Sequence, residues 1–228
     1  AVVVSDPAVG GEVGVEGVGT VETRQIGVIG YHHEVEWHIG GVAVRIRVAR
    51  REDCQNLGEV IVGANRAAFD GRVPEQCLLA LPVSTSVANW KRAFDSGAFD
   101  SDEQVLLVAE AASDGVVAFV LAGGYTAKVF RDRDISDMYP REIVSLHVAP
   151  GWQHRGVGRS LIGASADWLI ARQAKTLAVR VLELNPNRAF YARLGAQELG
   201  LQPYDWAGFA TREVIYGWPD ISRLRRFA

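Results

Sequence analysis

The chain has 228 residues, 48% of them hydrophobic and 22% charged, which suffices for a buried core and excludes a wholly disordered chain. Its net charge of -3 provides no basic field for nucleic acid, and its longest apolar stretch, 115–125, is far shorter than the roughly 20 residues of a membrane span. Cys54 and Cys77 are too few for a disulfide scaffold and lack zinc-site spacing. We therefore expect a cytoplasmic protein with reduced, buried thiols and no nucleic-acid, membrane or metal partner.

Residues 1–40 differ in composition from the rest of the chain. They hold eight glycines, six acidic residues and one arginine, and their valine-glycine alternation keeps neither a helical nor a strand period. His32, His33 and His38 invite a metal interpretation, but their spacing matches no familiar site and solvated imidazoles explain them more simply. We predict a glycine-rich acidic N-terminal extension over 1–40 and a folded domain over 41–228.

The chain becomes regular from residue 41, where apolar and polar side chains alternate over 42–48 as on a half-buried strand. Asp53 is expected to cap a helix that reaches about residue 70, and two further helical stretches are expected at 74–81 and 86–94. The runs 104–111 and 115–125 are typical of strands, and the Ser113-Asp114-Gly115 turn between them predicts a β-hairpin.

The second half of the sequence alternates strands with helices. Strands are expected at 142–148, 177–184 and 213–218, and a helix at 159–172. Asn185 and Pro186 are typical of the first residues of a short helix, which should end before Gly195. This order predicts an α/β (α+β) fold with a mixed sheet and helices on both faces.

The connection between the strand at 142–148 and the helix at 159–172 carries chemical information. Its Gly156 and Gly158 allow a tight turn that presents backbone N–H groups at the positive end of the helix, an arrangement that binds pyrophosphate. A P-loop is excluded because no Gly-Lys-Ser/Thr follows, and the dinucleotide fingerprint fails because Leu161 stands at its third glycine position.

The same segment resembles the signature of the GNAT superfamily of acyl-CoA-dependent N-acyltransferases, Val-x-Pro-x-x-Gln/Arg-x-x-Gly-x-Gly/Ala. Val148, Pro150, Gln153, Gly156 and Gly158 stand at its fixed positions. Residues 185–195 are similar to the family's short helix with its Phe-Tyr pair and Leu-Gly ending. With the strand at 42–48 and the closing Tyr-Gly-Trp at 216–218, the resemblance covers about residues 41–220.

The resemblance implies a mostly antiparallel sheet whose fourth and fifth strands splay apart to form an acyl-CoA cleft. The backbone of the fourth strand would hold the pantetheine arm, and the loop N–H groups would hold the pyrophosphate. An asparagine before the short helix contacts pantetheine in many relatives, and two asparagines qualify here because the segment is one residue shorter. The residues expected to bind acetyl-CoA are Leu146, His147, Val148, Gln153, His154, Arg155, Gly156, Val157, Gly158, Arg159, Ser160, Asn185 and Asn187.

The implied reaction is direct attack of a neutral amine on the thioester, through a tetrahedral intermediate from which CoA thiolate leaves. Tyr191 matches the family's tyrosine that protonates this thiolate. Glu142, six residues before Val148, matches the carboxylate that serves as base in some members, and Ser145, His147 or water are alternatives.

The leading hypothesis is therefore an acetyl-CoA-dependent N-acetyltransferase of a small molecule or peptide, with an acetyltransferase domain over 41–228. Its acceptor side would be built by the helices between 53 and 97 and the loop 126–140, where Asp132, Asp134 and Asp137 would attract a cationic amine. The alternative is a non-catalytic acyl-CoA-binding module that senses or regulates. Similar proteins are commonly dimers, so a homodimer is compatible with either hypothesis.

Overall fold

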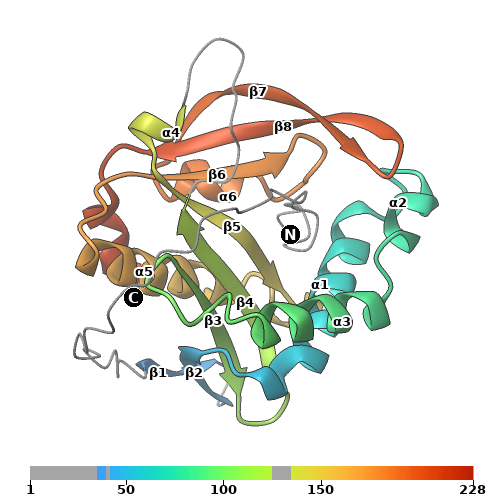
Figure 1. Cartoon of the computed structure of the whole chain (residues 1–228), viewed down its shortest axis with the longest axis horizontal. Helices are drawn as coiled ribbons and strands as arrows, with labels where there is room; N and C mark the ends of the chain where they lie inside the picture. Colours follow the sequence, from blue (N-terminus) through green and yellow to red (C-terminus); the bar gives the residue numbers. More distant parts are fainter. Residues whose placement is uncertain (1–34, 40–41, 125–134, 228) are drawn as a thin grey trace, which may run out of the picture.

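An eight-stranded sheet in the order β1-β2-β3-β4-β5-β6-β8-β7 organises the chain (Figure 1). The structure is a computed structural model that describes residues 35–39, 42–124 and 135–227. Every neighbouring pair of strands is antiparallel except β5 and β6, which are parallel. The strands are β1 (Val35–Ile39), β2 (Val42–Val48), β3 (Gln104–Ala111), β4 (Gly115–Gly124), β5 (Arg141–Val148), β6 (Leu177–Leu182), β7 (Gln197–Trp206) and β8 (Phe209–Trp218).

Helices lie on both faces of this sheet, so the predicted fold class is confirmed. Trp90 of α3 packs edge-on against Phe119 of β4. The His147 ring of the neighbouring strand β5 packs against the same Phe119 ring, on the same face of the sheet. The N-terminus of α5 approaches Leu146 and Val148 on the opposite face. The helices are α1 (Cys54–Phe69), α2 (Glu75–Leu79), α3 (Val83–Asp95), α4 (Ile135–Met138), α5 (Val157–Ala171) and α6 (Ala189–Arg193), with 3-10 turns η1 (Arg51–Asp53), η2 (Pro150–Trp152) and η3 (Ile221–Phe227).

The parallel pair β5–β6 is the point where the sheet opens. Its register contains only two residue pairs, Glu142 with Ala178 and Ile143 with Val179, although the strands continue to Val148 and Leu182. Beyond these pairs the two strands diverge, as the predicted splay requires. Backbone groups on the facing edges of β5 and β6 are therefore left without a neighbouring strand.

The structure has two strands that the sequence did not predict, and several element boundaries differ; for example, β8 begins at Phe209 rather than at residue 213. One of these strands is β1, which lies inside the segment 1–40 and pairs with β2. The other is β7, whose Gly200 and Pro203 argue against a strand when the sequence is considered alone. β7 accommodates both as an edge strand with an irregular register near Gly200. The short helix begins at Ala189 rather than Asn185, because the Asn185 side chain accepts the Asn187 N–H at 2.8 Å and forms a separate turn.

Cys54 and Cys77 are both free and buried, as expected. In the described residues, no group of histidine, cysteine and acidic side chains is arranged to hold a metal ion, and His32 and His33 lie outside that part of the chain. No described helix is both long and apolar enough to cross a membrane.

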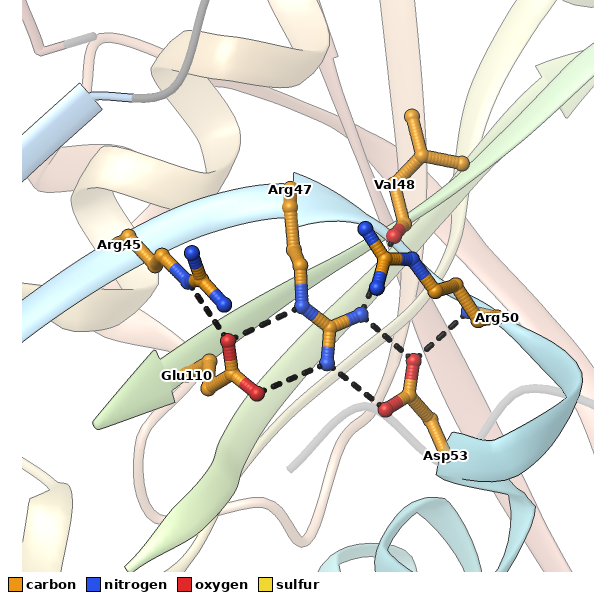
Figure 2. A network of polar contacts seen from close by, with 6 residues as sticks. All are labelled: Arg45, Arg47, Val48, Arg50, Asp53 and Glu110. Carbon is orange, nitrogen blue, oxygen red and sulfur yellow. Dashed lines mark hydrogen bonds and ion pairs between the residues drawn. The ribbon is translucent and has the colours of Figure 1, made fainter. Parts of the chain in front are cut away.

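A network of charged side chains fastens β2 to the start of α1 (Figure 2). Arg47 lies at its centre and donates to Asp53 through both terminal nitrogens, at 2.7 and 2.8 Å, and to Glu110 through two further contacts at 3.1 Å. Burial opposes ionisation of Asp53, but hydrogen bonds from Arg47 and from the Arg50 N–H outweigh it and hold the pKa of Asp53 below its usual range. Hydrogen bonds from Arg47 lower the pKa of Glu110 to about 2.

The depressed carboxylate pKa values make the stability contributed by this network dependent on pH. Its contribution is present above the carboxyl pKa values of the unfolded chain, near 4, and is lost as the pH falls toward the folded-state values. Through its two hydrogen bonds from Arg47, the Asp53 carboxylate also anchors the N-terminal end of α1 to β2.

We expect Arg47→Met to lower the free energy of unfolding by about 3 kcal/mol, because it leaves the nearly buried Asp53 carboxylate without its bidentate partner. Denaturant titration would measure the loss. Arg51→Met is the matched control, since the Arg51–Asp95 pair on the same turn is more than half exposed and such pairs contribute about 0–1 kcal/mol. Equal losses in the two variants would contradict a special role for the network.

Candidate active site

A pocket of about 690 Å³ opens at the end of β5, between the N-terminus of α5, the α6 segment and the C-terminal turn η3. It lies on the α5 face of the sheet, beside the gap between β5 and β6. Its lining residues are Leu146, Val148, Trp152, Gln153, His154, Arg155, Gly156, Gly158, Arg159, Asn185, Asn187, Phe190, Tyr191, Arg193, Leu194 and Phe227.

The loop that enters α5 has the backbone geometry of an anion site. His154 and Gly156 both adopt left-handed conformations, with φ of 60° and 88°, and Gly156 is the N-cap residue of α5. No side chain caps the helix, so N–H groups of its first turn remain directed toward the pocket end of the fifteen-residue helix. Such N–H groups, together with the helix dipole, favour a bound phosphate.

Gly158 keeps the floor of the pocket open. A Cβ atom at this position would lie 3.5 Å from Val148, 3.7 Å from Phe190 and 3.9 Å from Leu146, all of which line the pocket. A larger side chain would therefore fill the space between β5 and α6. The second glycine of the motif thus serves the pocket by its size, whereas Gly156 serves it by its backbone conformation.

Three arginines, Arg155, Arg159 and Arg193, line the pocket, and none of the described lining residues is acidic. The guanidinium of Arg155 lies 5.3 Å from the centre of the Trp152 ring, and that of Arg159 lies 5.6 Å from the Phe227 ring. These ring contacts orient both guanidinium groups while leaving their donors free for a ligand. The pocket therefore favours a ligand with several negative charges.

The edge of β5 offers backbone hydrogen-bonding groups to the same space. The Ala149 N–H donates to Val117 of β4, so by strand alternation the N–H and C=O groups of Leu146 and Val148 face the gap toward β6. The Gln153 side chain donates to the Val148 C=O at 3.1 Å and thereby ties the loop to the strand end. An extended ligand with amide groups can bind along this edge.

Tyr191 of α6 is the lining residue best suited to proton transfer. The residue is only 3% exposed, and its ring lies 5.1 Å from that of Phe190, 6.0 Å from that of Tyr216 and 6.1 Å from that of Trp218, measured between ring centres. Burial raises the pKa of Tyr191 above its usual value. The phenol is therefore neutral near pH 7 and can act as a proton donor, while its aromatic neighbours fix the ring.

The pocket brings together most of the residues predicted from the sequence. Leu146, Val148, Gln153, His154, Arg155, Gly156, Gly158, Arg159, Asn185, Asn187 and Tyr191 all line it. The side chains of Val157 and Ser160 do not: Val157 is buried in the core, and the Ser160 N–H is used by the helix, donating to the Gly156 C=O. The buried His147 ring packs on Phe119 on the opposite face, where burial lowers its pKa well below the usual value.

Glu142 is also outside the pocket, because an irregularity in β5 interrupts the regular alternation of side chains between the two faces of the sheet. In simple alternation Glu142 would share the face of Leu146 and Val148. The register against β4 shifts by one residue, because Leu121 pairs with Ser145 whereas Ala122 pairs with Ile143. This β-bulge turns Glu142 to the α1 face, where it is fully buried and paired with Arg180.

Five lining residues were not predicted: Trp152, Phe190, Arg193, Leu194 and Phe227. The first four lie inside the two motifs that the sequence offered, so the motifs identified the segments but not every side chain that faces the ligand space. Phe227 reaches the pocket because η3 packs against α5, and nothing in the local sequence indicates that contact.

Comparison with known proteins identifies the family of this chain. The model of the acetyltransferase (GNAT) family matches residues 78–196, just over half of the chain. A curated relative, the uncharacterized N-acetyltransferase YuaI of Bacillus subtilis, is 25% identical over 182 residues, which are 80% of this chain and 96% of that protein.

Solved structures share the fold. The PaiA N-acetyltransferase of Thermoplasma acidophilum, in complex with coenzyme A, has a TM-score of 0.57 and 16% identity, covering 76% of this chain and 97% of its own. YncA of Salmonella typhimurium, with its cofactor acetyl-CoA, has a TM-score of 0.52 and 18% identity, covering 77% and 92%. By the family match and the shared fold, the chain belongs to the GNAT acetyltransferase family and the protein is an acyltransferase.

Proposed function

We propose that the protein transfers the acetyl group of acetyl-CoA directly to a primary amine of a small molecule or peptide. The observation that carries this proposal is the pocket itself. It joins an anion site at the N-terminus of α5, an open strand edge on β5 and a buried tyrosine on α6. These three features match the pyrophosphate, the pantetheine amides and the thioester sulfur of acetyl-CoA, in that order along the ligand.

The residues present fit this co-substrate. The N–H groups of the loop and first helical turn, with Arg155 and Arg159, would hold the phosphates. The backbone of Leu146 and Val148 would pair with the pantetheine amides, and Asn185 and Asn187 lie on the other wall. Gly158 would leave room for the arm between them.

Tyr191 would act as the general acid. When an amine attacks the thioester carbon and the C–S bond breaks, the sulfur leaves as a thiolate, which is costly in a site shielded from water. The attacking nitrogen loses its surplus proton to water, and the Tyr191 phenol can donate its own proton to the sulfur and regain one from solvent afterwards. Glu142 is a weaker candidate for the base than the sequence suggested, because its carboxylate is held by Arg180 on the other face of the sheet.

The acceptor would approach from the α1–α2 face, since the pocket on the α5 face is taken by the co-substrate. Asp137 is exposed on α4, whereas Asp132 and Asp134 lie outside the described residues. The function is tested by mixing the protein with acetyl-CoA and a panel of amines, peptides and aminoglycosides while measuring thiol release. Amine-dependent release supports transfer, whereas tight CoA binding without release across the panel would favour a non-catalytic acyl-CoA-binding module.

The N-terminal segment is expected to be dispensable for co-substrate binding. β1 is the outermost strand at one edge of the sheet, four strands away from β5 in the strand order, and no described residue before Leu146 lines the pocket. Deleting residues 1–40 should leave the Michaelis constant for acetyl-CoA within a few fold. A truncated protein that keeps its thermal transition but no longer binds acetyl-CoA would refute this expectation.

A further inference from the structure

Three charged side chains are buried together on the face of the sheet opposite the acetyl-CoA pocket. Arg180 of β6 contacts Glu142 of β5 through two nitrogens, each at 3.4 Å, and Glu213 of β8 through a third at 3.5 Å. Both carboxylate side chains are 0% exposed, and that of Arg180 is 8% exposed. Two carboxylates and one guanidinium give this group a formal charge of -1, so it would attract a cation.

The group lies where β5 and β6 part. Glu142 belongs to one of the two residue pairs that join these strands, and Arg180 is the first residue of β6 beyond them. Glu213 pairs with Leu182, three residues beyond the last pair on β6, and Leu146 is likewise three residues beyond it on β5. Glu213 therefore lies on β8 beside the part of β6 that no longer pairs with β5.

Aromatic contacts identify the faces. On β8, Tyr216 stacks with Tyr191 on the pocket face, so Glu213, an odd number of residues away, points to the other face. There Leu182 packs with Phe69 of α1 and Trp206 of β7, whose rings are 5.3 Å apart. Glu213 thus stands buried on the α1–α2 face, the side from which the acceptor approaches in the proposed function.

Glu213 is the member of the group with an unused acceptor atom. Its Oε2 accepts the Gln202 side-chain N–H at 2.7 Å, whereas its buried Oε1 has no hydrogen-bond partner within the described part of the chain. Burial raises the pKa of this carboxyl group, which reflects the cost of keeping the charge there. A buried carboxylate oxygen without a partner is destabilising unless a further donor, from a ligand or from water, completes its hydrogen bonding.

We propose that Glu213 is the acceptor subsite: its Oε1 accepts a hydrogen bond from the ammonium group of the amine substrate. This inference rests on the proposed function and names the class of acceptor. The group's negative charge favours amines that carry no carboxylate beside the reacting nitrogen, because Arg180 is already held by two carboxylates and a further anion would be repelled.

Calorimetric binding to the protein–CoA complex tests the subsite without requiring turnover. Cadaverine and lysine differ by one carboxylate, as do tyramine and tyrosine, and the unmodified protein should bind the amine of at least one pair about 10-fold more tightly than its amino acid. Glu213→Gln should weaken that amine about 10- to 100-fold and leave CoA affinity unchanged. Glu198→Gln, an exposed change of the same chemistry on β7, is the control and should change neither affinity.

Thermal unfolding separates this role from a structural one. Glu213→Gln should leave the melting temperature unchanged or raise it, since Glu142 still compensates Arg180 and the variant removes the excess buried charge. A lower melting temperature with unchanged amine affinity would make Glu213 a structural partner of Arg180 and overturn the proposal. So would equal binding of the amine and its amino acid by the unmodified protein, or binding of neither. Amine binding through Glu213 without thiol release would uphold the subsite and reject acetyl transfer.

Discussion

Gly158→Val is expected to abolish measurable acetyl-CoA binding while the protein still folds. Gly158 has ordinary helical backbone, and a Cβ atom there meets its neighbours at normal contact distances, so the variant brings no backbone strain. The added methyl groups would occupy the space between Leu146, Val148 and Phe190 that the pantetheine arm needs. We expect at least about a 100-fold loss of affinity by calorimetry, equivalent to about 2.7 kcal/mol.

Gly156→Val should weaken binding by a different route. Gly156 has φ of 88°, and valine resists that conformation at a cost of about 1–3 kcal/mol, so the loop would rearrange and its N–H groups would turn from the phosphates. Gly151→Val is the matched control, since a Cβ atom at Gly151 meets nothing within 4 Å and the residue does not line the pocket. If the acetyl-CoA affinity is unchanged in both Gly158→Val and Gly156→Val, the loop is not part of the binding site.

Tyr191→Phe is expected to lower the turnover number about 10²- to 10⁴-fold, the usual contribution of general acid catalysis. The substitution removes only the hydroxyl and keeps the ring contacts with Phe190, Tyr216 and Trp218, so the melting temperature should change little. Acetyl-CoA affinity should also stay within a few fold, because the lost interaction acts in the transition state. A residual rate is expected, since water can supply the proton.

Tyr216→Phe is the control for this prediction. Tyr216 stacks with Tyr191 and is similarly buried, but it does not line the pocket, so its hydroxyl should be neutral for turnover. If Tyr191→Phe turns over at the rate of the unmodified protein where chemistry limits the rate, Tyr191 is a packing residue and the proton must come from another group.

The sequence predicted the lining of the pocket better than the proposed acceptor subsite. Residues 148–158 form one continuous connection, so their spacing alone places the glycines, Gln153 and the start of α5 near one another. The proposed acceptor subsite depends on contacts between distant segments. Glu142 and Glu213 lie 71 positions apart in the chain and meet only through Arg180. No local pattern predicts such a contact.

Two further differences arise in strands β5 and β7. The bulge in β5 reverses the face on which Glu142 lies. Because β5 is buried on both faces, its sequence shows no alternation of apolar and polar residues from which a bulge could be recognised. β7 tolerates Gly200 and Pro203 because it is an edge strand, whereas the same residues in a central strand would argue against it. In both cases the tertiary position of the strand overrides the local signal.

A single-turnover experiment tests direct acetyl transfer most directly. The protein, in excess over acetyl-CoA labelled in the acetyl group, is mixed with an amine identified by thiol release and quenched at successive times. If transfer is direct, label passes from acetyl-CoA to the amine with no labelled protein at any time, and Tyr191→Phe slows this single step. Label that accumulates on the protein before it reaches the amine would contradict direct attack, as would label that never reaches the amine.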